Sequence, residues 1–544
     1  MLVVLQYFID FKELPHRPQV LQTSPQTHQN QSSSLILIAY FQLHDILKPS
    51  DTHRLFDTLQ YSVEEQYSDS HLSFDVSTIF NYSEKPISIG KLNRKYRDIL
   101  YEGDMAISYK QLSLIVNGST EYRKAAKPRH KERKGELKDN ERAKRQAYLD
   151  QNYPATIWKN GVPFMFHESL NPIAKAAILK AIHFWYRETC IEFRPRTFQK
   201  EYLLFIGNDD GCWSTVGRDA SQGKQVVSIG DGCEHFGVTS HELAHALGVF
   251  HEQSRFDRDE SVTFNPRVVE KDLLFNFAKI SPRQMSTYGL PYDIGSVMHY
   301  TPTEFSNFPS IPTLTAIDTN LQQTMGQLEG PSFVDVHIMN QHYQCQDKCE
   351  TQAPCQNGGF TNSRNCKVCK CPTGFGGTYC QLIAPSFSPF CGGVLNAEET
   401  ARRFDITIRQ STNTRSKSCV YHIKAPEGKK IIVNILKIDS RCIEGCYQDG
   451  LEMKMKKDFR PVGYRFCCPE SSRRKIVSES SLVPFIVYSR ENDISVSFEY
   501  SFVSPNAGFD DEKASNSVLI ENPDGVLASD TPILLQKLGF QRHL

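Results

Sequence analysis

The chain has 544 residues and carries 62 Lys and Arg against 62 Asp and Glu, so its overall charge gives no electrostatic case for nucleic-acid binding. Its length favours several domains, and no apolar run reaches the ~20 residues that span a bilayer. The 16 cysteines all lie between Cys190 and Cys468. Their even number and close spacing predict disulfides made in the secretory pathway, and therefore a secreted, extracellular protein.

The N-terminal region, residues 1–50, holds two apolar runs, at positions 1–9 and 34–43. Neither has the basic start and small-residue cleavage site of a signal peptide, so the boundaries of a signal region stay open. Residues 51–145 are polar, free of cysteine and weakly patterned. Two sequons in this segment predict N-glycosylation at Asn81 and Asn117.

A strongly basic stretch closes this segment, with eleven Lys or Arg between Arg123 and Arg145. Such a run is typical of a solvated linker, and the alternative, a nucleic-acid arm, fits a secreted chain poorly. The stretch ends in R-A-K-R, a pattern that furin-like convertases cut. Cleavage after Arg145 leaves Gln146 as the new N-terminus, and a mobile, charged linker suits proteolysis.

Beyond the linker, the pattern predicts a mixed α+β domain. Asn171-Pro172 is expected to open a helix whose apolar residues recur at helical spacing as far as Trp185. Short apolar runs predict strands at residues 155–158, 162–166, 190–193, 202–206 and 226–229. We expect 226–229 to be the edge strand that lines a cleft, where an extended peptide can add by backbone hydrogen bonds.

The stretch 241–252 reads H-E-x-x-H-x-x-G-x-x-H-E. His241 and His245 are four residues apart and lie on one face of a helix, so both rings can reach one ion. Gly248 can adopt a positive φ that turns the chain back, which makes His251 a third ligand. Three protein ligands with an open position are the coordination of a catalytic zinc, so we expect one Zn²⁺ per chain.

Glu242 projects roughly 100° around the helix from His241, where it can face a water as the general base. A capping box from Thr239 to Glu242 is the alternative. Downstream, residues 296–300 read S-V-M-H-Y. The long histidine motif followed by such a Met-turn is the metzincin pattern.

At these residues the sequence resembles the astacin family of zinc endopeptidases, from about residue 153 to 345. Glu252 directly after the third histidine, the S-x-M-H-Y turn and the segment G-C-W-S-T-V-G-R at 211–218 carry the resemblance. It implies an α+β metzincin-type protease domain over residues 146–345. It also implies that Tyr300 lies beside the zinc and stabilises the transition state.

The resemblance assigns supporting roles to two further residues. Met298 would form an apolar floor under the histidines, and its alternative role is that of an ordinary core methionine. Glu252 would be tied, directly or through water, to the N-terminal region of the mature enzyme. A surface acid at the helix end is the alternative for Glu252.

The resemblance also makes residues 51–145 a propeptide. Tyr101-Glu102-Gly103-Asp104 resembles the F-x-G-D segment of astacin propeptides, in which the Asp binds the zinc and keeps the enzyme latent. Asp104 is therefore the expected latency switch. Glu102 is the rival carboxylate, and a surface role is the alternative for both. The propeptide has no cysteine, which excludes a thiolate switch.

In the family, Cys190 pairs with Cys345 and Cys212 with Cys233. The six cysteines within residues 346–381 resemble those of an EGF-like module, held by disulfides because the segment is too short for a large core. The pairing that this resemblance implies is Cys349–Cys366, Cys355–Cys369 and Cys371–Cys380. A metal cluster is the alternative for C-x-x-C-x-C, and it fits an oxidising compartment poorly.

Residues 391–502 alternate apolar and polar positions in several runs, which predicts an all-β sandwich. The segment resembles a CUB domain, whose first disulfide would be Cys391–Cys419. The pairing of the four remaining cysteines stays open: Cys442, Cys446, Cys467 and Cys468. Asp449 matches one Ca²⁺ ligand of calcium-binding CUB domains, and a solvated loop residue is the alternative. Residues 503–544 are expected to be a disordered tail.

Together these features predict a secreted zymogen, a zinc metalloendopeptidase that cuts internal peptide bonds of extracellular proteins. The domain order resembles that of invertebrate astacins, which makes matrix, cuticle or egg-envelope proteins the expected substrates. The alternative is an EGF–CUB adhesive protein that carries an inactive protease domain. The loss of Glu242 or of a histidine would favour that alternative, and all are present.

Overall fold

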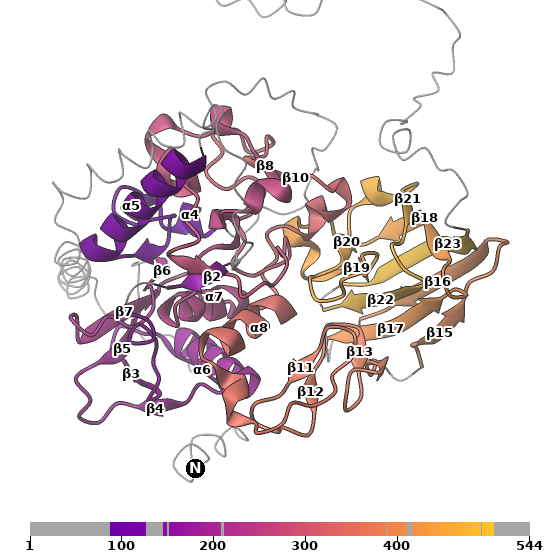
Figure 1. Ribbon diagram of the computed structural model, residues 1–544. Helices are drawn as coiled ribbons and strands as arrows, with labels where there is room; N and C mark the ends of the chain where they lie inside the picture. The colour runs from indigo at the N-terminus through magenta and orange to yellow at the C-terminus, as the bar shows by residue number, and fades with distance from the viewer. Residues whose placement is uncertain are drawn as a thin grey trace, which may run out of the picture.

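The computed structural model describes residues 88–126, 145–149, 152–207, 211–388, 390–410, 416–490 and 492–504. Residues 1–50, Asn81, most of the basic linker and nearly all of the C-terminal tail lie outside these ranges, so the expectations for them stay predictions. An α/β unit (residues 145–345) is followed by a small disulfide unit (346–388) and a β-sandwich (390–504) (Figure 1). None of the described helices is long and apolar enough to cross a membrane.

The α/β unit contributes five strands, and the N-terminal segment one, to a six-stranded sheet of order β1-β6-β7-β5-β3-β4. Its strands are β1 (Met105–Ala106), β3 (Val162–Phe166), β4 (Phe193–Pro195), β5 (Tyr202–Ile206), β6 (Cys212–Thr215) and β7 (Lys224–Ile229). Helices α6 (Pro172–Glu188) and α7 (Phe236–Ala246) share one apolar core with the sheet. Asn171 caps α6 as predicted, since its side chain accepts a hydrogen bond from the Ala174 amide at 2.7 Å.

Two strand predictions in this unit were wrong, and the strand expected at 190–193 begins only at Phe193. Residues 155–158 form a turn, because the Trp158 indole is drawn toward α7 and donates to the Ala246 carbonyl at 3.0 Å. Residues 226–229 belong to β7, which lies between β5 and β6 and is not an edge strand. Every residue of β7 after Lys224 is buried, as expected for a strand that is covered on both faces.

The edge of the central sheet is occupied by the N-terminal segment, residues 88–126. Its strand β1 pairs with β6 in parallel orientation. It also contains α4 (Ile89–Leu92), the 3₁₀ helix η2 (Arg94–Tyr96) and α5 (Tyr109–Ala126). Tyr96 and Leu100 pack with Trp213 and Val226 in a core separate from that of α6 and α7. Asn117 is exposed on α5, as a glycosylation site requires.

The remaining elements of the α/β unit are short, apart from helix α8 (Phe333–His342). Strand β2 (Arg145–Tyr148) pairs with β9 (Met285–Ser286), and β8 (Val262–Phe264) pairs with β10 (Leu314–Ala316). The 3₁₀ helices are η3 (Glu252–Ser254), η4 (Arg258–Glu260), η5 (Pro266–Val268), η6 (Lys271–Phe277), η7 (Thr319–Thr324) and η8 (Cys345–Lys348).

The disulfide unit consists of two small hairpins that lie against α6 and α8. Its strands are β11 (Phe360–Thr361), β12 (Cys369–Lys370), β13 (Phe375–Gly376) and β14 (Leu382–Ile383). The structure contains the expected bridges Cys349–Cys366, Cys355–Cys369 and Cys371–Cys380. A metal cluster at these cysteines is thereby excluded. Phe360 stacks on His337 of α8 with ring centroids 4.1 Å apart, which anchors the unit.

The last unit is a two-layer β-sandwich, as predicted. One sheet has the order β15-β17-β22-β19-β20 and the other β16-β23-β18-β21. The strands are β15 (Gly393–Asn396), β16 (Arg402–Ile408), β17 (Lys417–Lys424), β18 (Lys430–Asp439), β19 (Asp449–Met453), β20 (Tyr464–Phe466), β21 (Lys475–Val477), β22 (Leu482–Ser489) and β23 (Ile494–Val503). Two further 3₁₀ helices are η9 (Glu444–Cys446) and η10 (Pro469–Ser471).

The disulfides of the sandwich resolve the pairing that the sequence left open. Cys391 pairs with Cys419 as expected. The other bridges are Cys442–Cys468 and Cys446–Cys467. Asp449 is fully buried, and its carboxylate accepts hydrogen bonds from the amides of Arg490 and Asn492. The interpretation of Asp449 as a solvated loop residue was therefore wrong.

The sandwich lies directly against the α/β unit (Figure 1). The Gln323 side chain accepts hydrogen bonds from the amides of Cys467 and Cys468 at 3.1 and 3.3 Å. Tyr464 donates to the carboxylate of Asp318 at 2.6 Å, and Arg465 forms an ion pair with Glu329 at 2.9 Å. The contact is close enough that a Cβ added at Gly295 would overlap the Val462 side chain at 2.4 Å.

Candidate metal centre and active site

Helix α7 presents the first two histidines to the cleft. It begins after His235, and Thr239 inside it donates to the Cys233 carbonyl, so the capping-box alternative for Thr239 was wrong. The chain then leaves the helix at Gly248, whose φ is +106°. A Cβ at this position would also lie 2.8 Å from the ring of His342, so this turn requires glycine.

The three histidine rings converge through their Nε2 atoms, while each Nδ1 atom has an acceptor. The Nδ1 atoms of His241 and His245 lie 2.8 and 2.7 Å from the carbonyls of Val297 and Val249. The Nδ1 atom of His251 lies 2.8 Å from the Glu102 carboxylate. An imidazole that donates from Nδ1 keeps its lone pair on Nε2, so three lone pairs point at one spot.

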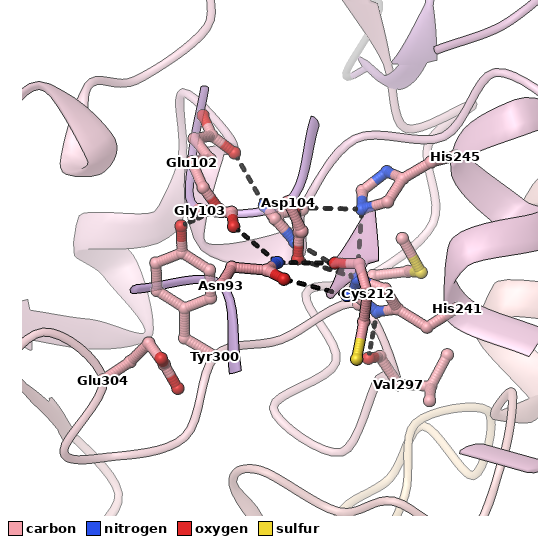
Figure 2. A network of polar contacts seen from close by, with 12 residues as sticks. Asn93, Glu102, Gly103, Asp104, Cys212, His241, His245, Val297, Tyr300 and Glu304 are labelled. Atoms are coloured by element: carbon pink, nitrogen blue, oxygen red, sulfur yellow. Dashed lines mark hydrogen bonds and ion pairs between the residues drawn. The ribbon is translucent and has the colours of Figure 1, made fainter. Parts of the chain in front are cut away.

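The spacing of these donors fits a zinc ion. The Nε2 atom of His241 lies 3.0 Å from that of His245 and 3.4 Å from that of His251. Ligand nitrogens about 2.0–2.1 Å from a tetrahedral zinc lie roughly 3.3 Å apart. Asp104 supplies a fourth donor, with Oδ2 3.3 Å from His241 and 3.1 Å from His251 (Figure 2). The four ligand atoms all lie within 4.8 Å of one another.

The backbone of the N-terminal segment reaches this site through a tight turn. Glu102 and Gly103 both have positive φ, and a Cβ at Gly103 would lie 2.9 Å from the ring of Phe305. Glu102 and Asp104 are 0% and 2% exposed, so a surface role for either was the wrong alternative. The hydroxyl of Tyr300 donates to the Glu102 carbonyl at 2.6 Å (Figure 2).

Glu242 is fully buried, and neither of its carboxylate oxygens has a hydrogen-bond partner among the described residues. Burial and the nearby charge of Asp104 hold the pKa of Glu242 well above its usual range. Burial likewise raises the pKa of Tyr300, together with the charges of Glu102 and Asp104. An unpaired carboxylate with a raised pKa next to three histidines is suited to accept a proton from water.

Comparisons with known proteins agree with this arrangement. Residues 150–344 match the astacin peptidase family, and residues 391–502 match the CUB domain. The chain is 86% identical over 502 residues to zinc metalloproteinase nas-29 of Caenorhabditis elegans, covering 92% of this chain and 94% of that protein. This chain belongs to the astacin family. It is a zinc metalloproteinase with a C-terminal CUB domain.

Two further relatives extend the comparison. Zinc metalloproteinase nas-23 of C. elegans is 43% identical over 423 residues, covering 78% of this chain and 75% of that protein. Among solved structures, High choriolytic enzyme 1, a hatching enzyme zinc-protease from Oryzias latipes, is 31% identical with a TM-score of 0.34. That match covers 36% of this chain and 98% of the fish enzyme.

In this astacin Glu252 is buried, so the surface-acid alternative was wrong. Its carboxylate accepts hydrogen bonds from the Asp293 amide at 2.7 Å and from Arg255 at 3.0 Å. Burial raises the pKa of Glu252 to about 8 although the Arg255 charge opposes this shift. The Glu252 amide donates to the carbonyl of buried Met298 at 2.9 Å. The third histidine is thereby joined to the Met-turn.

Sequence reasoning missed Asp335, which supports the Met-turn from helix α8. Its carboxylate accepts hydrogen bonds from the Ser296 hydroxyl at 2.5 Å and the Val297 amide at 3.0 Å. It also forms a capping box with Ser332 at the start of α8. The S-x-x-D pattern could have located this helix start. Nothing in the sequence places that start beside a turn that lies about 35 residues earlier.

Proposed function

We propose that this astacin is a secreted zymogen that hydrolyses internal peptide bonds of extracellular proteins. The observation that carries the proposal is the convergence of three histidine lone pairs beside the unpartnered carboxylate of Glu242. His241, His245 and His251 would hold a zinc ion, which supplies a Lewis acid that acidifies water and polarises a peptide carbonyl. An adhesive protein with an inactive protease domain has no use for this arrangement.

The chemistry follows from two further side chains. Glu242 takes a proton from the attacking water and passes it to the leaving amine. Tyr300 donates a hydrogen bond to the carbonyl oxygen, which becomes an oxyanion when water attacks the carbonyl carbon. In the uncut chain its hydroxyl is engaged by the Glu102 carbonyl, so the donor becomes free only when the N-terminal segment leaves.

The contacts of the N-terminal segment support its role as a propeptide. Asp104 occupies the position of a fourth ligand, and β1 covers the edge of β6 where an extended substrate would pair. A furin-like convertase would cut after Arg145, in the R-x-K-R sequence. Eight disulfides and no free cysteine among the described residues support an extracellular location.

The C-terminal units would direct the enzyme to its substrates. The three bridges of residues 346–381 support the EGF-like interpretation, and this module together with the CUB domain would bind protein partners or matrix. Matrix, cuticle and egg-envelope proteins are the proposed substrate classes. We propose no Ca²⁺ at Asp449, since its carboxylate is already engaged by Arg490 and Asn492.

The test is cleavage of casein or gelatin by the processed enzyme, with and without a zinc chelator, beside Glu242→Ala. This variant removes the base but no ligand, so zinc should stay near one per chain while activity falls by roughly 10²–10⁴. A chelator should abolish wild-type activity, and added zinc should restore it. Activity retained by Glu242→Ala would overturn the proposed function.

A further inference from the structure

Two buried glutamates from different domains interact electrostatically near helix α4 of the N-terminal segment. Glu304 follows the Met-turn of the catalytic domain, and Figure 2 shows it on the Tyr300 side of the zinc site. Glu444 comes from η9 of the CUB domain. Neither residue has a part in the hydrolysis derived above. Both are almost completely buried in the uncut chain, at 5% and 2% exposure.

Glu304 faces the catalytic cleft. It lines a small cavity of about 30 Å³ together with His241, His251 and Tyr300. The helix α4 lies directly on its carboxylate, since Ser88 donates to Oε1 at 2.6 Å. A Cβ added at Gly90 would lie 2.5 Å from the same oxygen. Departure of the N-terminal segment therefore opens Glu304 to whatever next enters the cleft.

Glu444 is the less expected member of the pair. Neither oxygen of its carboxylate has a hydrogen-bond partner among the described residues. The adjacent Gly445 is pressed onto the backbone of Gln327, where a Cβ would meet the chain at 2.5 Å. Gly326, the residue before Gln327, lines the same cavity as Glu304. The CUB domain thus places a buried carboxylate without a hydrogen-bond partner next to the segment 326–327, of which Gly326 lines the cleft cavity.

The electrostatics connect the two carboxylates to each other and to one cation. Burial and the charge of Glu304 raise the pKa of Glu444 to about 8, although the charge of Lys91 in α4 opposes this shift. The pKa of Glu304 is also raised by burial, while Ser88, Thr301 and Lys91 lower it. Lys91 would leave with the propeptide. Two neighbouring carboxylates then remain, and a cation between them stabilises both charged forms.

We propose that Glu304 and Glu444 form, in the processed enzyme, an acidic subsite that binds a lysine or arginine side chain of the protein substrate. The subsite rests on the proposed peptidase function and is built jointly by the catalytic and CUB domains. The α4 region lies on Glu304, since Ser88 donates to its carboxylate and Gly90 packs against the same oxygen. In the zymogen, α4 occupies it.

The experiment uses processed full-length enzyme and a peptide library in which each position around the cleaved bond carries Lys, Gln or Glu. Wild type should prefer Lys over Gln at one position by roughly tenfold in kcat/KM, the worth of about one well-placed charged contact. The paired variant Glu304→Gln/Glu444→Gln should lose this ratio. Glu260→Gln, an exposed acid outside the cavity, is the matched control and should keep it.

Binding provides a second readout that needs no turnover. The best Lys peptide should bind processed Glu242→Ala at least fivefold more tightly than its Gln counterpart in calorimetry, and the difference should vanish when both subsite glutamates are also Gln. If the Lys-to-Gln ratio were the same in the paired variant as in wild type, in both assays, the two glutamates would bind only the propeptide. That result would overturn the subsite. Absence of any cleavage by wild type would instead overturn the proposed function, while binding would still decide the subsite.

Discussion

The metal centre and the interface between the catalytic and CUB domains are both buried and polar, but they draw on very different stretches of chain. The three histidines lie between His241 and His251, in one helix and the turn after it. At the interface, Gln323 accepts a hydrogen bond from the amide of Cys467, 144 positions away. The histidines of the metal centre are therefore brought together by their spacing along a short stretch of sequence. The interface, in contrast, forms only after both domains have folded.

The largest expected effect tests how the metal centre is closed. Asp104→Ala in an Arg145→Ala background should give an uncleaved chain whose peptidase activity is raised by roughly 10²–10³, since a lost metal ligand is worth several kcal/mol. Glu102→Ala should not do so, because its carboxylate contacts His251 through Nδ1, on the side away from the Nε2 donors. If the Asp104→Ala variant were as inactive as the Arg145→Ala parent, steric blockage alone would maintain latency.

A second experiment separates chemistry from metal binding within the same centre. Tyr300→Phe in the processed enzyme should lower kcat by roughly 10² with little change in KM, because the hydrogen bond forms only in the transition state. Metal analysis of the variant is the control. If zinc were lost, Tyr300 would be a structural ligand and the assigned role would be wrong.

An ion cluster inside the CUB domain, behind the interface, should make stability pH-dependent, because Arg465 pairs both with Glu452 and with Glu329 of the catalytic domain. Glu452 is buried with Arg465 at 3.1 Å and Lys454 at 3.5 Å. Burial alone would raise the pKa of Glu452, but these two charges lower it below the ordinary value. The stabilisation is therefore present above the unfolded pKa of about 4.3 and is lost as the pH falls below that value.

Glu452→Gln should lower the free energy of unfolding by about 3 kcal/mol at pH 7, because buried Lys454 loses its carboxylate partner and Arg465 keeps only its pair with Glu329. Its stability should then fall less steeply than that of wild type below about pH 4.3. Thermal and denaturant unfolding at several pH values measure both effects. Asp405→Asn, which removes an exposed ion pair with Arg403, is the matched control and should change little.

The smallest effect concerns one polar contact across the interface. Tyr464→Phe removes the hydrogen bond to Asp318 and should cost about 1 kcal/mol of unfolding free energy. Peptidase activity on a short neutral peptide should not change, since neither residue lines the cleft cavity. A loss of activity would show that the interface and the metal centre are more closely coupled than their separate construction suggests.

The contrast between local and long-range contacts also explains which features the sequence could predict. Asn171-Pro172 and the apolar period located the start of α6, because a helix cap and its period depend on nearby residues. The place of β7 in the centre of its sheet was missed, since a short apolar run is the same in a central and an edge strand. The burial of Glu252 and the role of Asp335 depend on partners from distant segments, which no spacing rule contains.

The eight disulfides reach back only as far as Cys190, so nothing covalent ties the N-terminal segment to the catalytic domain once the chain is cut after Arg145. In the activation proposed above, the severed segment would be a free peptide that inhibits its own enzyme by mass action. Onset of activity would lag behind cleavage wherever the enzyme is concentrated, and would follow at once on dilution or on degradation of the peptide. With this layout of the cross-links, the proposed activation would be a two-stage event, in which a cut is followed by a dissociation.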